Sequence, residues 1–261
     1  MVLAAISVTF SVIFRINTLY QPNSFDILCW TLLYYVLIKY INTHQTKWLW
    51  TLAFVFALGF LNKYSITFLI LGIIPALLIS PHRHWFMKKQ VYLSIALALI
   101  LIAPNLIWQY NNQWPVFKHM RELAETQLVH VNRLDFLPTQ LFFFFPALFV
   151  LAAAFLAFFV YRPFRPYRFI ALSTLLTLLL FTWFKAKAYY AIGLYPVLMA
   201  FGAVYIDQYC RRGWSVYLKP VALLLPLLLF IRFLQIAFPI VSPDTMVAAP
   251  ELYKRFCMLR W

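Results

Sequence analysis

The chain has 261 residues, of which 64 % are hydrophobic and only 11 % are charged. Soluble domains are about 45–50 % apolar and about 25 % charged, so the composition excludes an ordinary water-soluble domain. The abundant apolar surface excludes intrinsic disorder, and three cysteines (Cys29, Cys210 and Cys257) are too few for a disulfide framework. The net charge of +15 would indicate nucleic-acid binding in a soluble protein, whereas in a membrane protein such cations collect in cytoplasmic loops.

The apolar runs predict an all-α, polytopic membrane helical bundle. A hydrocarbon core about 30 Å thick needs roughly 20 apolar residues per helix, and long uninterrupted runs favour helices over barrel strands. Reading along the chain gives eight spans, near residues 25–42, 46–62, 64–80, 90–108, 140–161, 169–184, 188–206 and 219–240. The first stretch, residues 1–14, is too short to cross and is interpreted as the back half of a truncated helix. We therefore expect a bundle over residues 1–240 and a short outer C-terminal tail over residues 241–261.

The distribution of Lys and Arg predicts the orientation. With residue 1 in the cytoplasm, the inner loops carry Lys39, Lys47, Arg83, Lys88, Lys89, Arg162, Arg165, Arg168, Arg211, Arg212 and Lys219. The short outer loops carry only Arg15, Lys63, Lys185 and Lys187. Cytoplasmic loops are enriched in Lys and Arg. The eleven cations of one set of loops against four of the other therefore place the N-terminus inside and the C-terminus outside. The positive charge is then mostly a matter of topology, and no nucleic-acid partner is expected.

The outer loop over residues 109–139 is long and rich in polar and aromatic residues. Pro115 can begin a helix, and Val116, Met120 and Leu123 then recur at helical spacing, which predicts a helix lying in the membrane interface. This helix is either a connector shaped by the membrane surface or a lid over an active cleft. His119 and Glu122 lie one turn apart on it, but two groups do not complete a metal site.

Charged residues at the outer ends of the predicted spans allow two interpretations each. Asp26 begins a span, where an acid can simply complement the helix dipole. Lys63 lies in a very short turn, either as a lysine reaching the interface or as the counter-charge for an anionic head group. The segment 185–190 suits a lipid phosphate, and equally an aromatic belt with ordinary end-of-helix lysines. The sequence contains no Walker loop, dinucleotide fingerprint or nucleophile elbow.

Several short segments occur in a characteristic order between about residues 15 and 205. They are Pro-Asn-Ser-Phe-Asp at 22–26, Gly-Phe-Leu-Asn-Lys-Tyr-Ser at 59–65, Pro-Asn-Leu-Ile-Trp-Gln at 104–109, Gln-Trp-Pro-Val at 113–116, Thr-Gln-Leu at 126–128 and Lys-Ala-Lys-Ala-Tyr-Tyr at 185–190. Their order and spacing resemble those of the polyprenyl-phosphate-sugar glycosyltransferases of the protein O-mannosyltransferase and aminoarabinose-transferase type (family 39, GT-C fold).

The resemblance implies that a sugar is transferred from a polyprenyl-phosphate carrier, the donor substrate, to a glycan, lipid or protein acceptor. The reaction would take place at the outer face of a bacterial-type cytoplasmic (inner) membrane. The resemblance makes Asp26 a supporting acid and leaves a divalent-metal requirement open, with no metal ligand assigned. It implies that carrier phosphate and substrate are bound by Lys63, Lys185, Lys187, Tyr189, Tyr190, Trp108, Gln109, Trp114, His119, Glu122 and Gln127.

The chain departs from the family pattern at its start. In the family the main catalytic acid lies in the first large outer loop, upstream of the Asp26 segment, and this chain begins too late to contain it. We therefore expect an N-terminally truncated copy that is inactive by itself. The alternative is a non-enzymatic polytopic membrane protein or a lipid-carrier transporter. Transporters place ionisable residues mid-membrane, whereas here only Arg232 falls deep in a span, which favours the enzyme.

Overall fold

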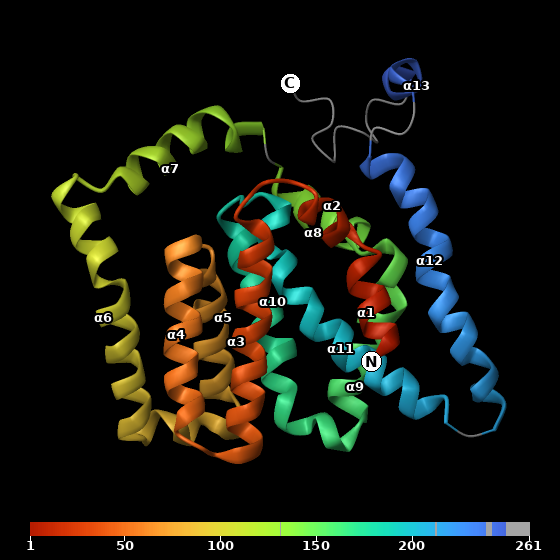
Figure 1. Ribbon diagram of the computed structural model, residues 1–261, viewed down its shortest axis with the longest axis horizontal. Helices are drawn as coiled ribbons and strands as arrows, with labels where there is room; N and C mark the ends of the chain where they lie inside the picture. Colours follow the sequence, from red (N-terminus) through yellow and green to blue (C-terminus); the bar gives the residue numbers. More distant parts are fainter. Residues whose placement is uncertain (131, 212, 239–241, 249–261) are drawn as a thin grey trace. The chain divides into compact units, whose positions relative to one another are not determined.

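The computed structural model describes residues 1–130, 132–211, 213–238 and 242–248, and every regular element among them is helical (Figure 1). The predicted all-α class is thereby confirmed; the predicted tail boundary at 240/241 falls outside the described residues. The α-helices are α1 (Val2–Thr9), α2 (Val12–Asn17), α3 (Asn23–Thr43), α4 (Lys47–Asn62), α5 (Ile66–Ile79), α6 (Lys89–Asn111), α7 (Pro115–Thr126), α8 (Arg133–Phe143), α9 (Leu148–Val160), α10 (Arg168–Trp183), α11 (Tyr195–Tyr209), α12 (Leu218–Ala237) and α13 (Pro243–Ala248). Short 3₁₀ helices connect them: η1 (Pro81–Met87), η2 (Leu128–His130), η3 (Phe145–Ala147), η4 (Arg162–Tyr167), η5 (Ala188–Leu194) and η6 (Gly213–Tyr217).

Several helices are long and apolar enough to cross a membrane. Within the described residues there are five, or seven if each of two bent pairs forms one span, and α4 is a shorter apolar helix of 16 residues. The prediction of a polytopic membrane bundle is therefore confirmed, although the spans are less regular than the eight expected. The stretch 64–80 ends in a bend of 106° between α5 and η1, and the stretch 140–161 contains a bend of 61° between α8 and η3–α9. Pro81 and Pro146 lie at these bends, where the missing N–H of proline interrupts the helical hydrogen bonds.

The first apolar stretch consists of two short helices where the sequence suggested one. The chain breaks at Phe10 and Ser11, between α1 and α2. The Ser11 hydroxyl donates to the Val8 carbonyl at 2.8 Å and accepts from the Ile13 amide at 3.2 Å, so it ends one helix and begins the next. This side-chain competition for backbone groups is the local reason why serine favours helix ends.

Contacts divide the chain into two compact units, each described here by itself. One comprises Met1–Gln21, Pro138–Ala157 and the part of the chain from Leu198 onward; the other comprises Pro22–Leu137 and Phe158–Val197. In the first unit, α12 packs against α1 and η3. An aromatic cluster joins these segments, with Phe230 lying 5.2 Å from Phe10 and 5.6 Å from Phe14 between ring centroids.

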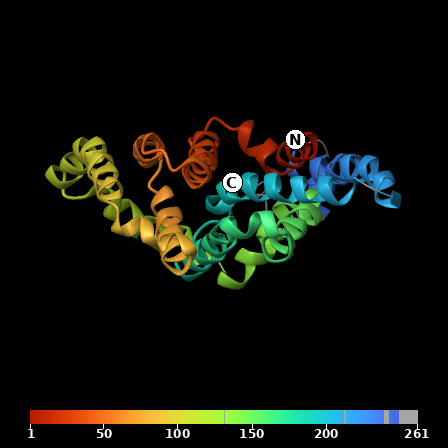
Figure 2. The same ribbon diagram turned by 90° about the horizontal axis from the view of Figure 1, so that it is seen from below.

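The second unit is built from antiparallel helices. α4 lies between α3 and α6, and α5 packs along α10, as the view along the helices shows (Figure 2). Helices α3 and α5 begin, and α4, α6 and α10 end, at one end of this unit, which we call the Lys63 end. The opposite end carries Lys39, Lys47, Arg83, Lys88, Lys89, Arg162, Arg165 and Arg168. No acidic residue lies in the segments 39–47, 80–90 and 161–168 that form it.

Small residues allow α5 and α10 to approach closely. A Cβ atom at Gly72 would lie 2.1 Å from the Thr177 hydroxyl and 2.8 Å from the Ser173 carbonyl, so only glycine fits there. Ser173 also bonds to the Tyr34 hydroxyl of α3 at 2.8 Å, and both side chains are fully buried. Close backbone approach and buried hydroxyl contacts are the usual means of helix association in lipid, where the hydrophobic effect supplies no driving force.

We expect Gly72→Leu to lower the stability of the second unit by about 1–3 kcal/mol, because the new side chain must displace the α10 backbone. Thermal unfolding in detergent, followed by tryptophan fluorescence, measures this loss. The matched control is Leu71→Ala, because Leu71 is half exposed on the same helix. Equal melting temperatures for the two variants would contradict the close α5–α10 packing.

Candidate functional site

The turn between α4 and α5 holds Lys63 against the start of α3. The Lys63 amide donates to the Gly59 carbonyl at 2.8 Å and closes the last turn of α4. The Asn62 side-chain amide donates to the Pro22 carbonyl at 3.0 Å, which fastens the turn to the residue before α3. Since only three residues separate α4 from α5, the backbone of Lys63 has little freedom, and its side chain is directed by this anchoring.

Lys63 forms an ion pair with Asp26. The ammonium donates to Oδ1 of Asn23 at 2.7 Å and lies 3.7 Å from Oδ2 of Asp26. The lysine side chain is 19 % exposed, whereas that of Asp26 is 6 % exposed. Asn23 and Asp26 stand one turn apart on α3, so their side chains share one face of that helix and can address the same cation. The ammonium is thus held by two side chains of α3 and is accessible only over a small part of its surface.

The carboxylate of Asp26 is occupied on both oxygens. Its Oδ1 accepts from the Trp30 indole N–H at 3.0 Å, and its Oδ2 accepts from the Ser65 hydroxyl at 2.9 Å in addition to facing Lys63. Trp30 comes from the same helix, one turn further on, while Ser65 comes from the turn that carries Lys63. Asp26 is therefore placed to orient the lysine and to balance its charge, and its hydrogen bonds leave it poorly suited to accept a proton from a substrate.

Two aromatic rings also contact the Lys63 ammonium. It lies 4.3 Å from the ring centroid of Tyr190 and 5.2 Å from that of Tyr189, which are cation–π distances. Both tyrosines belong to η5, which packs against α3. This approach requires Gly193, because a Cβ atom there would come within 2.7 Å of the Trp30 side chain.

Burial lowers the pKa of Lys63 below its usual value of 10.5, because the ammonium loses hydration in this setting. The negative charge of Asp26 acts in the opposite direction, and the positive charge of nearby Lys187 lowers the pKa further. Lys187 itself donates to the side-chain carbonyl of Gln127. Lys187 is thus a second cation at the Lys63 end and lies close enough to Lys63 to affect its pKa. It directly precedes η5 and is 124 positions away from Lys63 along the chain.

Gln109 connects the long loop that follows α6 to the Lys63 turn. Its side-chain amide donates to the Tyr64 hydroxyl at 2.8 Å, and that hydroxyl donates to Oδ1 of Asn105 at 2.9 Å. Its side-chain carbonyl accepts from the Val116 amide of α7 at 3.3 Å, and its backbone carbonyl accepts from the Trp114 amide at 2.7 Å. Gln109 therefore fixes the start of α7 relative to the residue next to Lys63.

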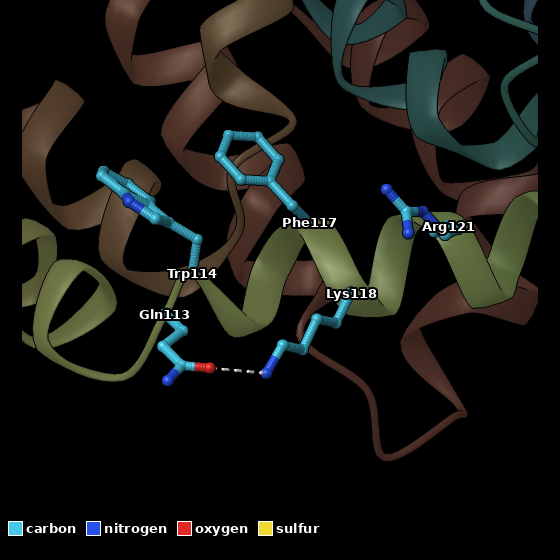
Figure 3. Close-up of a pocket in the computed structure, with 5 residues that line it drawn as sticks. All are labelled: Gln113, Trp114, Phe117, Lys118 and Arg121. Carbon is cyan, nitrogen blue, oxygen red and sulfur yellow. Dashed lines mark hydrogen bonds between the residues drawn. The ribbon is translucent and has the colours of Figure 1, made fainter.

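The helix predicted in the long loop is present as α7 and begins at Pro115 as expected, while its position in the membrane interface stays a prediction. Gln113 and Trp114 before it have φ of 59° and 54°, a left-handed conformation that is uncommon in non-glycine residues. Beside them lies a hollow of about 310 Å³ lined by Gln113, Trp114, Phe117, Lys118 and Arg121. Figure 3 shows the Trp114 and Phe117 rings on one side of the helix and the Gln113–Lys118 hydrogen bond on the other.

The remaining residues implied by the resemblance lie apart from this cluster. Trp108 is 54 % exposed on α6, and Lys185, His119 and Glu122 are also exposed. In the described part of the chain, no hydrogen bond, ion pair or cation–π contact joins these four side chains to the Lys63–Asp26 pair, and no group of three His, Cys, Asp or Glu residues could hold a metal ion. Their assignment to the site stays a prediction.

The sequence did not single out Asn23, Trp30, Ser65 and Tyr64 as site residues. A usable signal existed for two of them, since Asn23 precedes Asp26 by one helical turn and Ser65 follows Lys63 within the same short turn. Trp30 and Tyr64 resemble the many other aromatic residues of an apolar helix, and only their contacts distinguish them.

We expect Lys63→Met to lower the stability of the second unit by about 1–3 kcal/mol, because the mostly buried Asp26 carboxylate loses its cation. Adding Asp26→Asn to this variant should restore part of the loss, since the uncompensated charge is then removed. A double-mutant cycle on thermal unfolding in detergent measures the coupling. Strictly additive losses would contradict the ion pair.

Comparison with known protein families gives a match over the first part of the chain. Residues 1–108 match the family model described as dolichyl-phosphate-mannose-protein mannosyltransferase. No curated protein and no solved structure matches the chain. The matched segment contains Asn23, Asp26, Trp30, Lys63 and Ser65, while Tyr189 and Tyr190 lie outside it. The match confirms the resemblance to the GT-C glycosyltransferase family over the part of the chain that carries the Asp26–Lys63 pair.

Proposed function

We propose that this chain is part of a multi-pass membrane glycosyltransferase whose donor is a sugar linked to a polyprenyl phosphate, and that Lys63 binds the phosphate of this carrier. The family match supports the glycosyltransferase class. The observation that carries the finer proposal is the fixed ammonium of Lys63, held by Asn23 and Asp26 and walled by two tyrosine rings, at the end of membrane-spanning helices.

The depth of Lys63 suits a lipid-linked phosphate. The α4–α5 turn lies at the ends of apolar helices, where the head groups of a bilayer meet its hydrocarbon core. A carrier lipid can then place its phosphate beside Lys63 while its prenyl chain stays in the bilayer. A cation at this depth with a small exposed surface favours a ligand that arrives from the membrane over one that arrives from water.

Phosphate binding requires positive charge in addition to that of Lys63. The Lys63–Asp26 pair is neutral as a whole, so the pair alone would attract a phosphate only weakly. Lys187 supplies an additional positive charge close to Lys63. The phenol groups of Tyr189 and Tyr190 can donate hydrogen bonds to phosphate oxygens, as tyrosine hydroxyls do.

The proposed chemistry is a displacement at the anomeric carbon of the donor sugar. The bond between this carbon and the carrier phosphate oxygen breaks, a bond to the acceptor oxygen forms, and the acceptor loses its proton to a base. Lys63 and Lys187 stabilise the negative charge that develops on the departing phosphate. Asp26 acts as a positioning residue for Lys63, because its oxygens are already engaged by Trp30 and Ser65.

We further propose that the Lys63 end faces the outside of the cytoplasmic membrane. The opposite end of the second unit carries only cations in its connecting segments, whereas acidic residues such as Asp26, Glu122, Glu125 and Asp135 lie toward the Lys63 end. The enrichment of cytoplasmic loops in Lys and Arg then assigns the opposite end to the cytoplasm. The sugar acceptor would be a glycan, lipid or protein on the outer side.

A binding experiment on the full chain tests the role of Lys63. Undecaprenyl phosphate in detergent micelles should bind, undecaprenol should bind much more weakly, and Lys63→Met should weaken phosphate binding at least tenfold, which corresponds to about 1.4 kcal/mol. The matched control is Lys39→Met, a cation near the opposite end of the second unit. Microscale thermophoresis measures the dissociation constants.

Two results would contradict the proposal. Equal binding of undecaprenol and undecaprenyl phosphate would show that the phosphate is not recognised. An equal loss in the Lys63 and Lys39 variants would show that the charge acts from a distance and not through a site at the α4–α5 turn.

The lowered pKa of Lys63 predicts a pH dependence. The ammonium loses its proton at a lower pH than an exposed lysine does, so affinity for the carrier phosphate should fall as the pH rises through the alkaline range below 10.5. Lys63→Arg should bind with a flatter pH profile because guanidinium stays charged. A wild-type affinity that falls only where an exposed lysine loses its proton would refute a phosphate contact that depends on the lowered pKa of Lys63.

A further inference from the structure

The first unit contains an apolar hollow of about 520 Å³ that the proposed reaction does not use. Its walls come from α9, α11 and α12, with side chains such as Leu156, Tyr205 and Val221. Helices α11 and α12 belong to segments that are long and apolar enough to span a membrane, and α9 belongs to a bent pair that is long enough if the pair forms one span. The hollow therefore lies among helices whose surroundings are lipid, where an apolar space between spans is filled by hydrocarbon rather than by water.

A cluster of charged side chains lies next in the chain to residues that line this hollow. The Asp207 carboxylate lies 3.2 Å from the guanidinium of Arg211 and 3.0 Å from the ammonium of Lys219. Tyr209 and Cys210 line the hollow between Asp207 and Arg211 in the chain, and Leu218 lines it next to Lys219. The apolar space thus begins at the level of the charges, where α11 ends and α12 begins.

We propose that this hollow binds an anionic glycerophospholipid of the bilayer. One acyl chain occupies the space between α9, α11 and α12, and the lipid phosphate lies against Arg211 and Lys219. The two cations share a single carboxylate in the structure, which leaves one positive charge at the mouth of an apolar groove. This combination is complementary to a phosphate attached to a hydrocarbon chain.

The partly exposed ion pairs of Asp207 suggest how the lipid enters. All three charged side chains are about half exposed, so their pairs cost little to separate. A phosphate can replace the carboxylate as partner of Arg211 and Lys219, since it offers more acceptor oxygens to the same two donors. Asp207 thereby competes with the lipid, and its removal should strengthen the binding.

Native mass spectrometry of the full chain, released from nanodiscs with equal amounts of phosphatidylglycerol and phosphatidylethanolamine, tests the proposal. The wild type should retain phosphatidylglycerol at least fivefold over phosphatidylethanolamine. Arg211→Gln with Lys219→Gln should abolish this preference, and Asp207→Asn should increase it. Ala222→Trp, which fills the hollow, should lose both lipids. The matched control is Arg83→Gln with Arg162→Gln, two exposed cations of the second unit.

Retention of both lipids in equal amounts by the wild type would overturn the role of the cations. Unchanged retention in Ala222→Trp would overturn the acyl-chain site, and Ala222→Leu gives a milder filling variant should the tryptophan variant fail to fold. A stable dimer without bound lipid would show that a second copy of the chain covers the hollow, which also overturns the proposal. The test reads lipid mass and not sugar transfer, so it stands apart from the proposed function.

Discussion

The cost of burying a charge at the ends of apolar helices determines the arrangement of the Lys63 end. An ammonium with little exposed surface loses most of its hydration, and the surrounding groups must replace it. Here the replacement comes from an amide oxygen, a carboxylate and two aromatic rings, supplied by α3 and η5. Asp26 in turn needs Trp30 and Ser65, so a single lysine explains the positions of several polar groups in an otherwise apolar unit.

The packing of the second unit serves the same requirement. Gly193 lets η5 approach Trp30 closely enough to bring Tyr189 and Tyr190 to the ammonium. Gly72 and Ser173 bring α5 and α10 together, and α10 leads into the segment that carries η5. In lipid these contacts depend on shape and hydrogen bonds, because burying apolar surface gives no advantage there. Small residues therefore contribute to the position of the charged site together with its own hydrogen bonds.

Composition and apolar run length were sufficient to predict the helical membrane class, since lipid allows few alternatives for a chain this apolar. The start of α7 at Pro115 could also be predicted, because proline at the first helical position is a local signal. The break at Ser11 and the bend near Pro146 were not predicted, because both depend on which hydrogen bonds the local backbone groups form. For the candidate site, the ends of the apolar stretches indicated Asp26, Lys63 and segment 185–190. The contributions of Asn23 and Trp30 depend on tertiary packing, which the sequence pattern does not indicate.

The double engagement of Gln109 has a consequence for motion at this end of the unit. The side-chain nitrogen of Gln109 donates to the Tyr64 hydroxyl, and its side-chain oxygen accepts from the Val116 amide in the first turn of α7. A swing of α7 about the left-handed residues Gln113 and Trp114 must break or drag this link. A ligand that displaces α7 would therefore disturb the Tyr64 hydroxyl, one residue away from Lys63, through the side chain of Gln109.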